Sequence, residues 1–106
     1  MLTIIIAKDF SETVGGRYRK EGDFSGEQFR EELLKPRFIE ATSLNVPLLI
    51  DFDGGYGYPT SFLEESFGGL VRDGFSKDVV LKTLEFKSLD NFKIIERVKN
   101  YILEAW

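Results

Sequence analysis

The chain contains no cysteine and no histidine among its 106 residues. Without cysteine it has no disulfide, no thiolate zinc cluster and no thiol nucleophile, and without histidine it has no imidazole acid, base or metal ligand. Ser–His–Asp and Cys–His mechanisms are therefore excluded within this chain. We accordingly expect a protein that is not an enzyme and that uses no metal and no cofactor.

Long apolar runs and a surplus of positive charge are also missing. No run approaches the roughly 18 apolar residues of a membrane span, and no charged segment followed by an apolar one opens the chain as a leader would. The formal net charge is -4, so the mean field of the protein repels nucleic-acid phosphates and anionic lipids. We expect a cytoplasmic protein without a membrane partner, on which nucleic acid would need a local basic patch.

What is present is the composition of an ordinary globular protein. Hydrophobic residues make up 42% of the chain and charged residues 30%, which is enough apolar material for one core. A second core would not fit into a chain of this length. We therefore treat residues 1–106 as a single domain.

Hydrophobic patterning predicts three strands. A continuous, β-branched run over residues 2–7 favours a buried strand, and a polar, glycine-containing loop with room for a short hairpin follows over residues 8–23. The most apolar stretch, residues 46–52, is predicted to be the central strand. Residues 79–86 alternate between apolar and polar, which favours a third strand with one partly exposed face.

Three helices are predicted between and after these strands. Ser25 stands as an N-cap with Gln28 three residues later, as in a capping box, which predicts a helix over residues 26–42 that Pro36 kinks or interrupts. Thr60 or Ser61 is predicted to cap a second helix that Asp73 and Gly74 close, and Ser88 to cap a third with an apolar stripe from Phe92 to Trp106. Because Gly68 and Gly69 weaken a helix, we expect them to permit a close approach to the sheet or to a partner.

Strands that alternate with helices indicate an α/β fold with a mixed, partly parallel sheet of about four strands and helices packed on it. We expect the core to combine apolar residues of the strands with apolar residues of the helices. The strand set is Ile4, Ile6, Leu48, Ile50, Val80 and Leu84, and the helix set is Phe29, Leu33, Phe67, Leu70, Ile95 and Val98.

A first candidate site is the acidic end of the central strand, Ile50-Asp51-Phe52-Asp53-Gly54. The pattern is similar to the Asp-x-Asp of haloacid-dehalogenase-type phosphatases, in which a nucleophile and an acid–base aspartate share a magnesium ion. In that family the motif follows the first strand, whereas here it follows the second. The alternative to a magnesium-dependent phosphoester hydrolase using Asp51 and Asp53, with Asp9 as the remaining acid, is a strand end whose carboxylates accept hydrogen bonds from a loop.

A second candidate site is the cluster that begins with Gly15, Gly16 and Arg17. Successive amides around paired glycines form anion-binding nests, and a neighbouring cation reinforces them. The alternative is a solvated turn. Together with Arg19, Lys20 and Arg37, the same arginine offers the local basic patch that a nucleic-acid interface would need.

A third candidate site lies in the loop and helix start after the central strand, at Tyr56, Tyr58, Thr60 and Ser61. Aromatic residues on a glycine-rich loop favour a partner-binding surface, and a phosphoryl group on a hydroxyl at a helix start meets free amides and the positive helix end. The alternative is that the two tyrosines fold onto the core and that Thr60 is a plain cap. The first interpretation predicts a partner-binding surface or phosphorylation switch.

The chain resembles the STAS-like family of prokaryotic domains. The segments that carry the resemblance are Asp9-Phe10-Ser11, Gly15-Gly16-Arg17-Tyr18, Ser25-Gly26-Glu27-Gln28-Phe29-Arg30, Ile50-Asp51-Phe52-Asp53-Gly54 and the stretch from Gly57 to Leu70. The family is named for its likeness to sulfate-transporter and anti-sigma-factor-antagonist domains, which are small non-enzymatic α/β modules that bind a serine-kinase ATPase of the histidine-kinase-like class.

The resemblance implies a protein-interaction or regulatory switch module that docks on a histidine-kinase-like ATPase or a related partner. In anti-sigma-factor antagonists an acidic strand end leads through a short loop to an Asp-Ser pair that caps a glycine-containing helix. The segment from Ile50 to Gly69 follows this plan, except that Pro59 and Thr60 stand where the aspartate would precede the phosphate acceptor.

Overall fold

A computed structural model describes all residues from 1 to 106 and shows a three-stranded parallel sheet. The strands are β1 (Leu2–Ile5), β2 (Leu48–Asp51) and β3 (Leu84–Lys87), and β2 lies in the centre. The α/β class and the central position of the second strand are confirmed. The sheet has three strands in place of about four, and all of its pairings are parallel.

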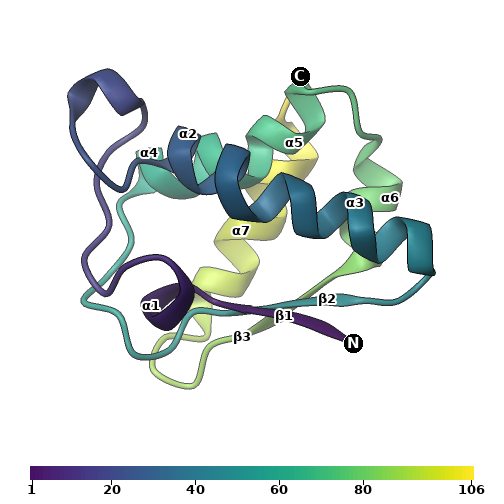
Figure 1. Cartoon of the computed structure of the whole chain (residues 1–106), viewed down its shortest axis with the longest axis horizontal. Coiled ribbons are helices and arrows are strands. Elements are labelled where there is room, and N and C mark those ends of the chain that lie inside the picture. The colour runs from purple at the N-terminus through teal and green to yellow at the C-terminus, as the bar shows by residue number, and fades with distance from the viewer.

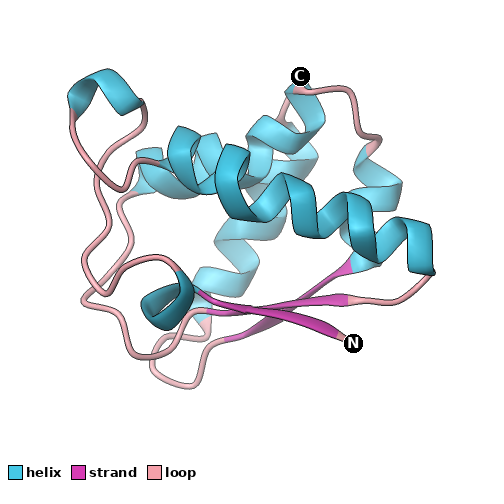
Figure 2. Cartoon of the chain, in the orientation of Figure 1, coloured by secondary structure: helices cyan, strands magenta, loops and turns pink.

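The helical segments connect the strands and follow the last one (Figure 2). They are α1 (Ile6–Asp9), the 3-10 turn η1 (Arg19–Glu21), α2 (Gly26–Phe29), the π segment η2 (Arg30–Leu34), α3 (Lys35–Leu44), α4 (Thr60–Leu63), the π segment η3 (Glu64–Gly68), α5 (Gly69–Arg72), α6 (Lys77–Thr83) and α7 (Lys93–Glu104). Two long continuous helices, 26–44 and 60–72, therefore each contain one widened π turn. No helix has both the length and the apolar character that a membrane span requires.

The sheet and the helices form two layers, with the helices 26–44, 60–72 and α7 above the strands in Figure 1. The strand register aligns the side chains that face the helices, and these are Leu2, Ile4, Leu48, Ile50, Leu84 and Phe86. On the opposite face Thr3, Glu85 and Lys87 are exposed. One face of the sheet therefore closes the core, and successive strand residues alternate between the two environments.

The core is a single cluster of 18 buried residues drawn from strands and helices. All six residues predicted for the strand side of the core are buried, although Ile6 and Val80 lie in helices α1 and α6. Of the predicted helix set, Leu33 and Ile95 are only partly buried. Sequence patterning thus identified the buried side chains more reliably than the elements that carry them.

The first long helix begins as predicted. Oγ of Ser25 accepts a hydrogen bond from the backbone N–H of Gln28 at 3.0 Å, and Oε1 of Gln28 accepts from the backbone N–H of Phe24 at 2.9 Å. Directly before Pro36 the regular α-helical pattern is interrupted by a widened turn, in which the N–H of Lys35 bonds to the carbonyl of Arg30. The chain stays helical, and the α-helical pattern resumes at Lys35 and continues through the proline.

Several predicted boundaries are wrong, including those of the central strand, which covers Leu48–Asp51 instead of residues 46–52. The first strand ends at Ile5 instead of residue 7, and η1 occupies the loop where a hairpin was considered. Residues 79–83 belong to helix α6 and not to the third strand. Ser88 does not cap α7, which begins at Lys93; its hydroxyl instead bonds to the backbone of Asn91 in the preceding turn.

Helix α6 shows why the third strand was placed too early. Oγ of Ser76 accepts a hydrogen bond from the N–H of Val79 at 3.2 Å, which caps a helix at that point. Nζ of Lys77 donates to the carbonyl of Leu103 at 2.6 Å and so joins α6 to the end of α7. The local cap by Ser76 and the tertiary contact of Lys77 together overcome the strand preference of a short valine-rich segment.

The two glycines of the second long helix have different surroundings. A Cβ on Gly69 would lie 2.8 Å from Cζ of Arg30, which is buried and paired with Glu65 and Asp73. A Cβ on Gly68 would meet the carboxylate of Glu64 on the same helix. The close approach that we predicted therefore exists at Gly69, but it is made to a neighbouring helix and not to the sheet.

We expect Gly69→Ala to lower the free energy of unfolding by about 1–3 kcal/mol, because an overpacked buried side chain must shift. This loss should appear although alanine gains about 1 kcal/mol in helix propensity. Gly68→Ala is the matched control, since Glu64 can move toward solvent. Urea denaturation of both variants measures the difference, and equal stabilities would contradict the assigned contact.

Candidate functional site

The loops that follow β2 and β3 meet at the carboxyl edge of the sheet, because both strands run in the same direction (Figure 1). The side chain of Asp53 joins them: its Oδ1 accepts hydrogen bonds from the backbone N–H of Leu89 at 2.8 Å and of Asp90 at 3.1 Å. The two loops are therefore held together by one carboxylate at the end of the central strand.

The other acids near the strand ends also accept hydrogen bonds within the fold. Oδ1 of Asp51 accepts from the N–H of Asp53 at 2.9 Å, and its Oδ2 lies 3.5 Å from Nζ of Lys87. Oδ2 of Asp9 accepts from the N–H of Ile5 at 2.8 Å. No group of three or more acidic side chains that could hold a metal ion is found in the chain. The aspartates of the first candidate site thus stabilise the strand end and its loops.

Tyr58 folds back onto the core. Its hydroxyl donates a hydrogen bond to the carbonyl of Phe52 at 2.9 Å, and its ring packs edge-on against Phe52 with 5.4 Å between ring centroids. Burial, followed by the negative charges of Asp51 and Asp53, raises the pKa of Tyr58 to about 12. For this tyrosine the structure matches the alternative in which the ring supports the loop from inside.

The raised pKa of Tyr58 gives a spectroscopic prediction. In the difference between the tyrosinate absorbance titrations of the wild type and Tyr58→Phe, we expect a midpoint near pH 12 instead of 10. The folded protein favours the neutral phenol, so this group's contribution to stability is present below pH 10 and is lost as the pH rises toward 12. Tyr56→Phe serves as control. A Tyr58 midpoint at 10 would contradict the buried position.

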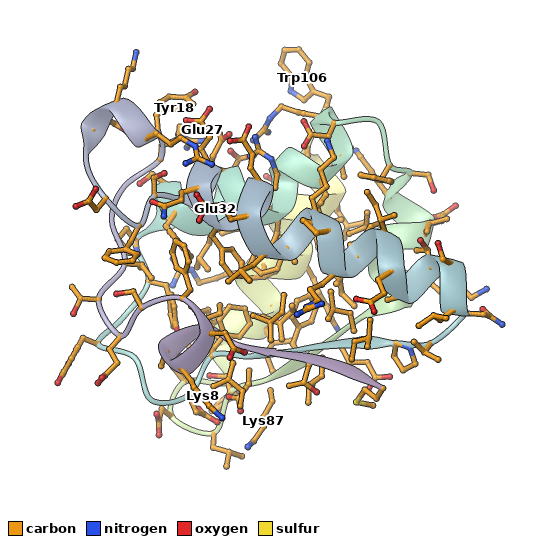
Figure 3. All side chains as sticks on the ribbon, viewed as in Figure 1. Lys8, Tyr18, Glu27, Glu32, Lys87 and Trp106 are labelled. Atoms are coloured by element: carbon orange, nitrogen blue, oxygen red, sulfur yellow. The ribbon has the colours of Figure 1, made fainter.

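Three large apolar side chains at the same edge remain in solvent. Tyr56 is 81% exposed, Leu89 80% and Phe92 73%. Tyr56 lies on the loop after β2, and Leu89 and Phe92 lie on the loop between β3 and α7. Lys87, the last residue of β3, lies at the lower end of the molecule in Figure 3. We call Tyr56, Leu89 and Phe92 the apolar rim.

A cavity of about 240 Å³ lies between the two loops, and of the apolar rim Tyr56 lines it, whereas Leu89 and Phe92 are chain neighbours of lining residues. The cavity is lined by Phe52, Gly55, Tyr56, Gly57, Tyr58, Ser88, Asp90, Asn91, Ile94 and Arg97. Ligand crevices of open α/β sheets lie at this position, beyond the carboxyl ends of the strands. The cavity and the rim together form the candidate site.

Thr60 and Ser61 lie beside this site in the first turn of α4. The N-cap of that helix is Pro59, so the prediction that a hydroxyl caps it is wrong. Thr60 is exposed and its Oγ1 accepts a hydrogen bond from Nη2 of Arg97 at 3.1 Å, whereas Ser61 is half-buried. Thr60 therefore contacts a side chain that lines the cavity.

Sequence reasoning missed Arg97, Leu89 and Phe92. Phe92 was assigned to the apolar stripe of the last helix, but α7 begins one residue later, so its ring projects from the loop instead of into the core. The helical spacing of Phe92 and Ile95 concealed this difference. An arginine in an amphipathic helix has no feature in the sequence that distinguishes it from a solvated charge.

The Gly15, Gly16 and Arg17 segment belongs to the loop between α1 and η1. The N–H of Gly15 donates to the carbonyl of Phe24 at 2.8 Å, and Nη1 of Arg17 pairs with the carboxylate of Glu64. The hydrogen bond with Glu64 is the main cause that raises the pKa of Arg17. The charge that would reinforce an anion site is therefore neutralised within the fold.

The other basic residues considered for nucleic acid are also largely paired. Arg19 contacts Glu31 at 3.0 Å and Glu32 at 3.1 Å, and Arg37 contacts Glu40 at 3.1 Å. Tyr18, Glu27 and Glu32 crowd this corner of the molecule in Figure 3. Acidic side chains thus interleave with the basic ones where a phosphate backbone would need continuous positive charge.

Residues 25–92 match the family model described as a STAS-like domain of unknown function (DUF4325). The chain belongs to this STAS-like family. The matched region begins at the N-cap Ser25 and ends at Phe92, so it includes β2, β3 and both loops of the candidate site. No curated protein and no solved structure matches the chain. The resemblance noted in the sequence is confirmed, and it covers the edge of the sheet where the apolar rim lies.

Proposed function

We propose that this STAS-like domain is a non-enzymatic protein-interaction module with a regulatory role, and that it docks through the apolar rim. The observation that carries the proposal is that Tyr56, Leu89 and Phe92, each more than two-thirds exposed, lie on the two loops that line one cavity. Single exposed apolar residues are common on protein surfaces, but a group of them beside a cavity is typical of interfaces. Aromatic side chains are also enriched in the residues that dominate binding energy.

The chemistry of the edge supports binding over catalysis. Asp51 and Asp53 are the acids that a phosphoester hydrolase would use, and both accept hydrogen bonds from the backbone around them. A nucleophilic aspartate and its acid–base partner must instead face a substrate and a shared cation. No observation in the structure favours the hydrolase alternative.

The likeness to anti-sigma-factor antagonists supports a histidine-kinase-like ATPase as the partner. In this proposal Thr60 and Ser61 act at the border of the docking surface, and phosphorylation of Thr60 would add about two negative charges beside Arg97. Such a modification would change the charge that a partner meets without altering the core, because Thr60 is exposed.

Site-specific photo-crosslinking in the native host tests the docking surface. A photoreactive phenylalanine analogue at Tyr56 or Phe92 is expected to capture one defined protein. The same analogue at Trp106, which is 95% exposed and projects at the end of the molecule opposite Lys87 (Figure 3), is the matched control. Capture of the same proteins from all three positions would overturn the proposal.

Affinity pull-downs with purified variants provide a second readout. We expect Phe92→Ser, Thr60→Glu and Ser61→Glu to reduce recovery of the captured protein, whereas Trp106→Ser retains it. Calorimetric titration with magnesium and an assay with a generic phosphoester address the hydrolase alternative. Magnesium-dependent hydrolysis that is abolished by Asp53→Asn would contradict the proposed interaction module and would show that the protein is an enzyme.

A further inference from the structure

Arg97 differs from every other arginine of this protein. The chain has six arginines, and Arg17, Arg19, Arg30, Arg37 and Arg72 each form an ion pair with a carboxylate. Arg97 forms none; its guanidinium donates to Oγ1 of Thr60 at 3.1 Å and to the hydroxyl of Tyr101 at 3.5 Å. Arg97 is therefore the one arginine whose positive charge no carboxylate of this chain neutralises, so its guanidinium is free to bind an anion of another molecule.

The position of Arg97 connects this charge to the docking surface. The side chain lines the cavity next to the apolar rim and is half-buried. Lys93 lies four residues before Arg97, one turn earlier on α7, so the two cations are neighbours on the helix surface. Lys93 also has no carboxylate partner. Asp90 lines the same cavity from the β3 loop and is the one acidic side chain among the lining residues.

A guanidinium favours a particular ligand chemistry. Its planar donors match a carboxylate with two parallel hydrogen bonds, and partial removal from water strengthens them. Hydrogen bonds from Nη2 to Thr60 and Tyr101 restrict the Arg97 guanidinium, so less side-chain conformational entropy is lost when it binds an anion. Thr60 and Tyr101 are thus positioning residues for Arg97.

We infer that the docking surface recognises an acidic–apolar segment of its protein partner, in which an Asp or Glu carboxylate binds Arg97 and an adjacent large apolar side chain packs on Tyr56, Leu89 and Phe92. This inference rests on the proposed function and adds the chemistry of the partner. Asp90 lines the same cavity, so a second carboxylate of the segment would be repelled near it.

Selection from a library of random peptides displayed on phage tests the inference with the purified full-length chain as bait. Wild-type protein is expected to enrich peptides that place Asp or Glu within a few residues of an aromatic or leucine side chain. Arg97→Glu is expected to enrich Lys or Arg at the acidic position instead, because it replaces the one cation that lines the cavity by an anion. Arg37→Glu, a charge reversal at an exposed arginine elsewhere, should select the same peptides as the wild type.

Affinities of one selected peptide then give a quantitative test. Arg97→Gln should weaken its binding about tenfold or more, since a hydrogen-bonded charge is lost, and Arg97→Lys should restore only part of the affinity. Replacement of the peptide's acid by its amide should have an effect of the same size on wild-type protein and no effect on Arg97→Gln. Unchanged melting temperatures ensure that the variants are folded.

The possible failures are distinguishable. If no peptide is enriched, or if enriched peptides bind Phe92→Ser as well as wild type, the docking surface itself is wrong and the proposed function falls with it. If peptides depend on Phe92 but show no preference for an acid and no dependence on Arg97, only the acidic recognition is overturned. Competition by millimolar inorganic phosphate, together with indifference to the peptide's acid, would assign Arg97 to a phosphoryl group and also overturn the inference.

Discussion

Replacing Glu65 by leucine is expected to lower the free energy of unfolding by about 3–5 kcal/mol. Oε2 of Glu65 lies 2.7 Å from Nη1 of Arg30, and both residues are buried between the two long helices. Nε of Arg30 also bonds to Asp73 at 3.0 Å. Without Glu65, the buried Arg30 guanidinium keeps Asp73 as its one carboxylate partner. The loss of stability should therefore exceed the net contribution of the Arg30–Glu65 ion pair to folding.

A double-variant cycle separates these two quantities. Arg30→Met combined with Glu65→Leu removes both charges, so we expect the double variant to be more stable than the sum of the two single losses implies. Arg37→Met is the control at an exposed pair, where the change should stay within about 0.5 kcal/mol. Urea denaturation of the wild type and all four variants measures these losses, because urea, unlike guanidinium, does not screen ion pairs. A Glu65→Leu loss as small as that of Arg37→Met would contradict the buried ion pair.

Replacing Ile50 by alanine is expected to cost about 2–5 kcal/mol, because the deletion leaves a cavity in the middle of the core. Ile50 is fully buried on the central strand, where its register partners are Ile4 and Phe86. The sheet has no other strand with neighbours on both sides, so the surrounding backbone has little freedom to collapse into the space.

Leu49→Ala is the control for Ile50→Ala. It removes a side chain of similar size from the preceding residue, which points to the opposite face of the sheet and is only half-buried. Thermal and chemical denaturation should therefore show a clearly smaller loss than for Ile50→Ala. Equal losses at the two positions would mean that helices cover both faces of the sheet, contrary to the layer order described above.

Local sequence signals determined several parts of this fold. The polar contact that starts the first long helix involves Ser25 and Gln28, which are three residues apart, so a short window contains the whole interaction. The apolar run that ends at Asp51 identified the central strand for the same reason, because a short window contains the whole signal, although only the alternate residues Leu48 and Ile50 are fully buried. The family resemblance was carried by contiguous motifs of the same kind.

The features that the sequence alone did not determine depend on residues far apart in the chain. The Ser76 cap of α6 is a local signal, but the hydrogen bond from Lys77 to the carbonyl of Leu103 joins α6 to the end of α7, which lies far along the chain. The role of Gly69 became visible only when Arg30 lay against it.

The candidate site shows the same division. Its loop residue Tyr56 could be selected from composition, since an aromatic side chain among glycines is unusual in a turn. Tyr58, two residues later, has the same chemistry but is drawn inward by the carbonyl of Phe52, and Arg97 stands out only because every other arginine found a carboxylate. Local patterns determine which segments become helices, strands and loops because their interactions span a few residues. Which polar groups are satisfied and which remain free for a partner depends on long-range pairing, and only the tertiary structure decides that.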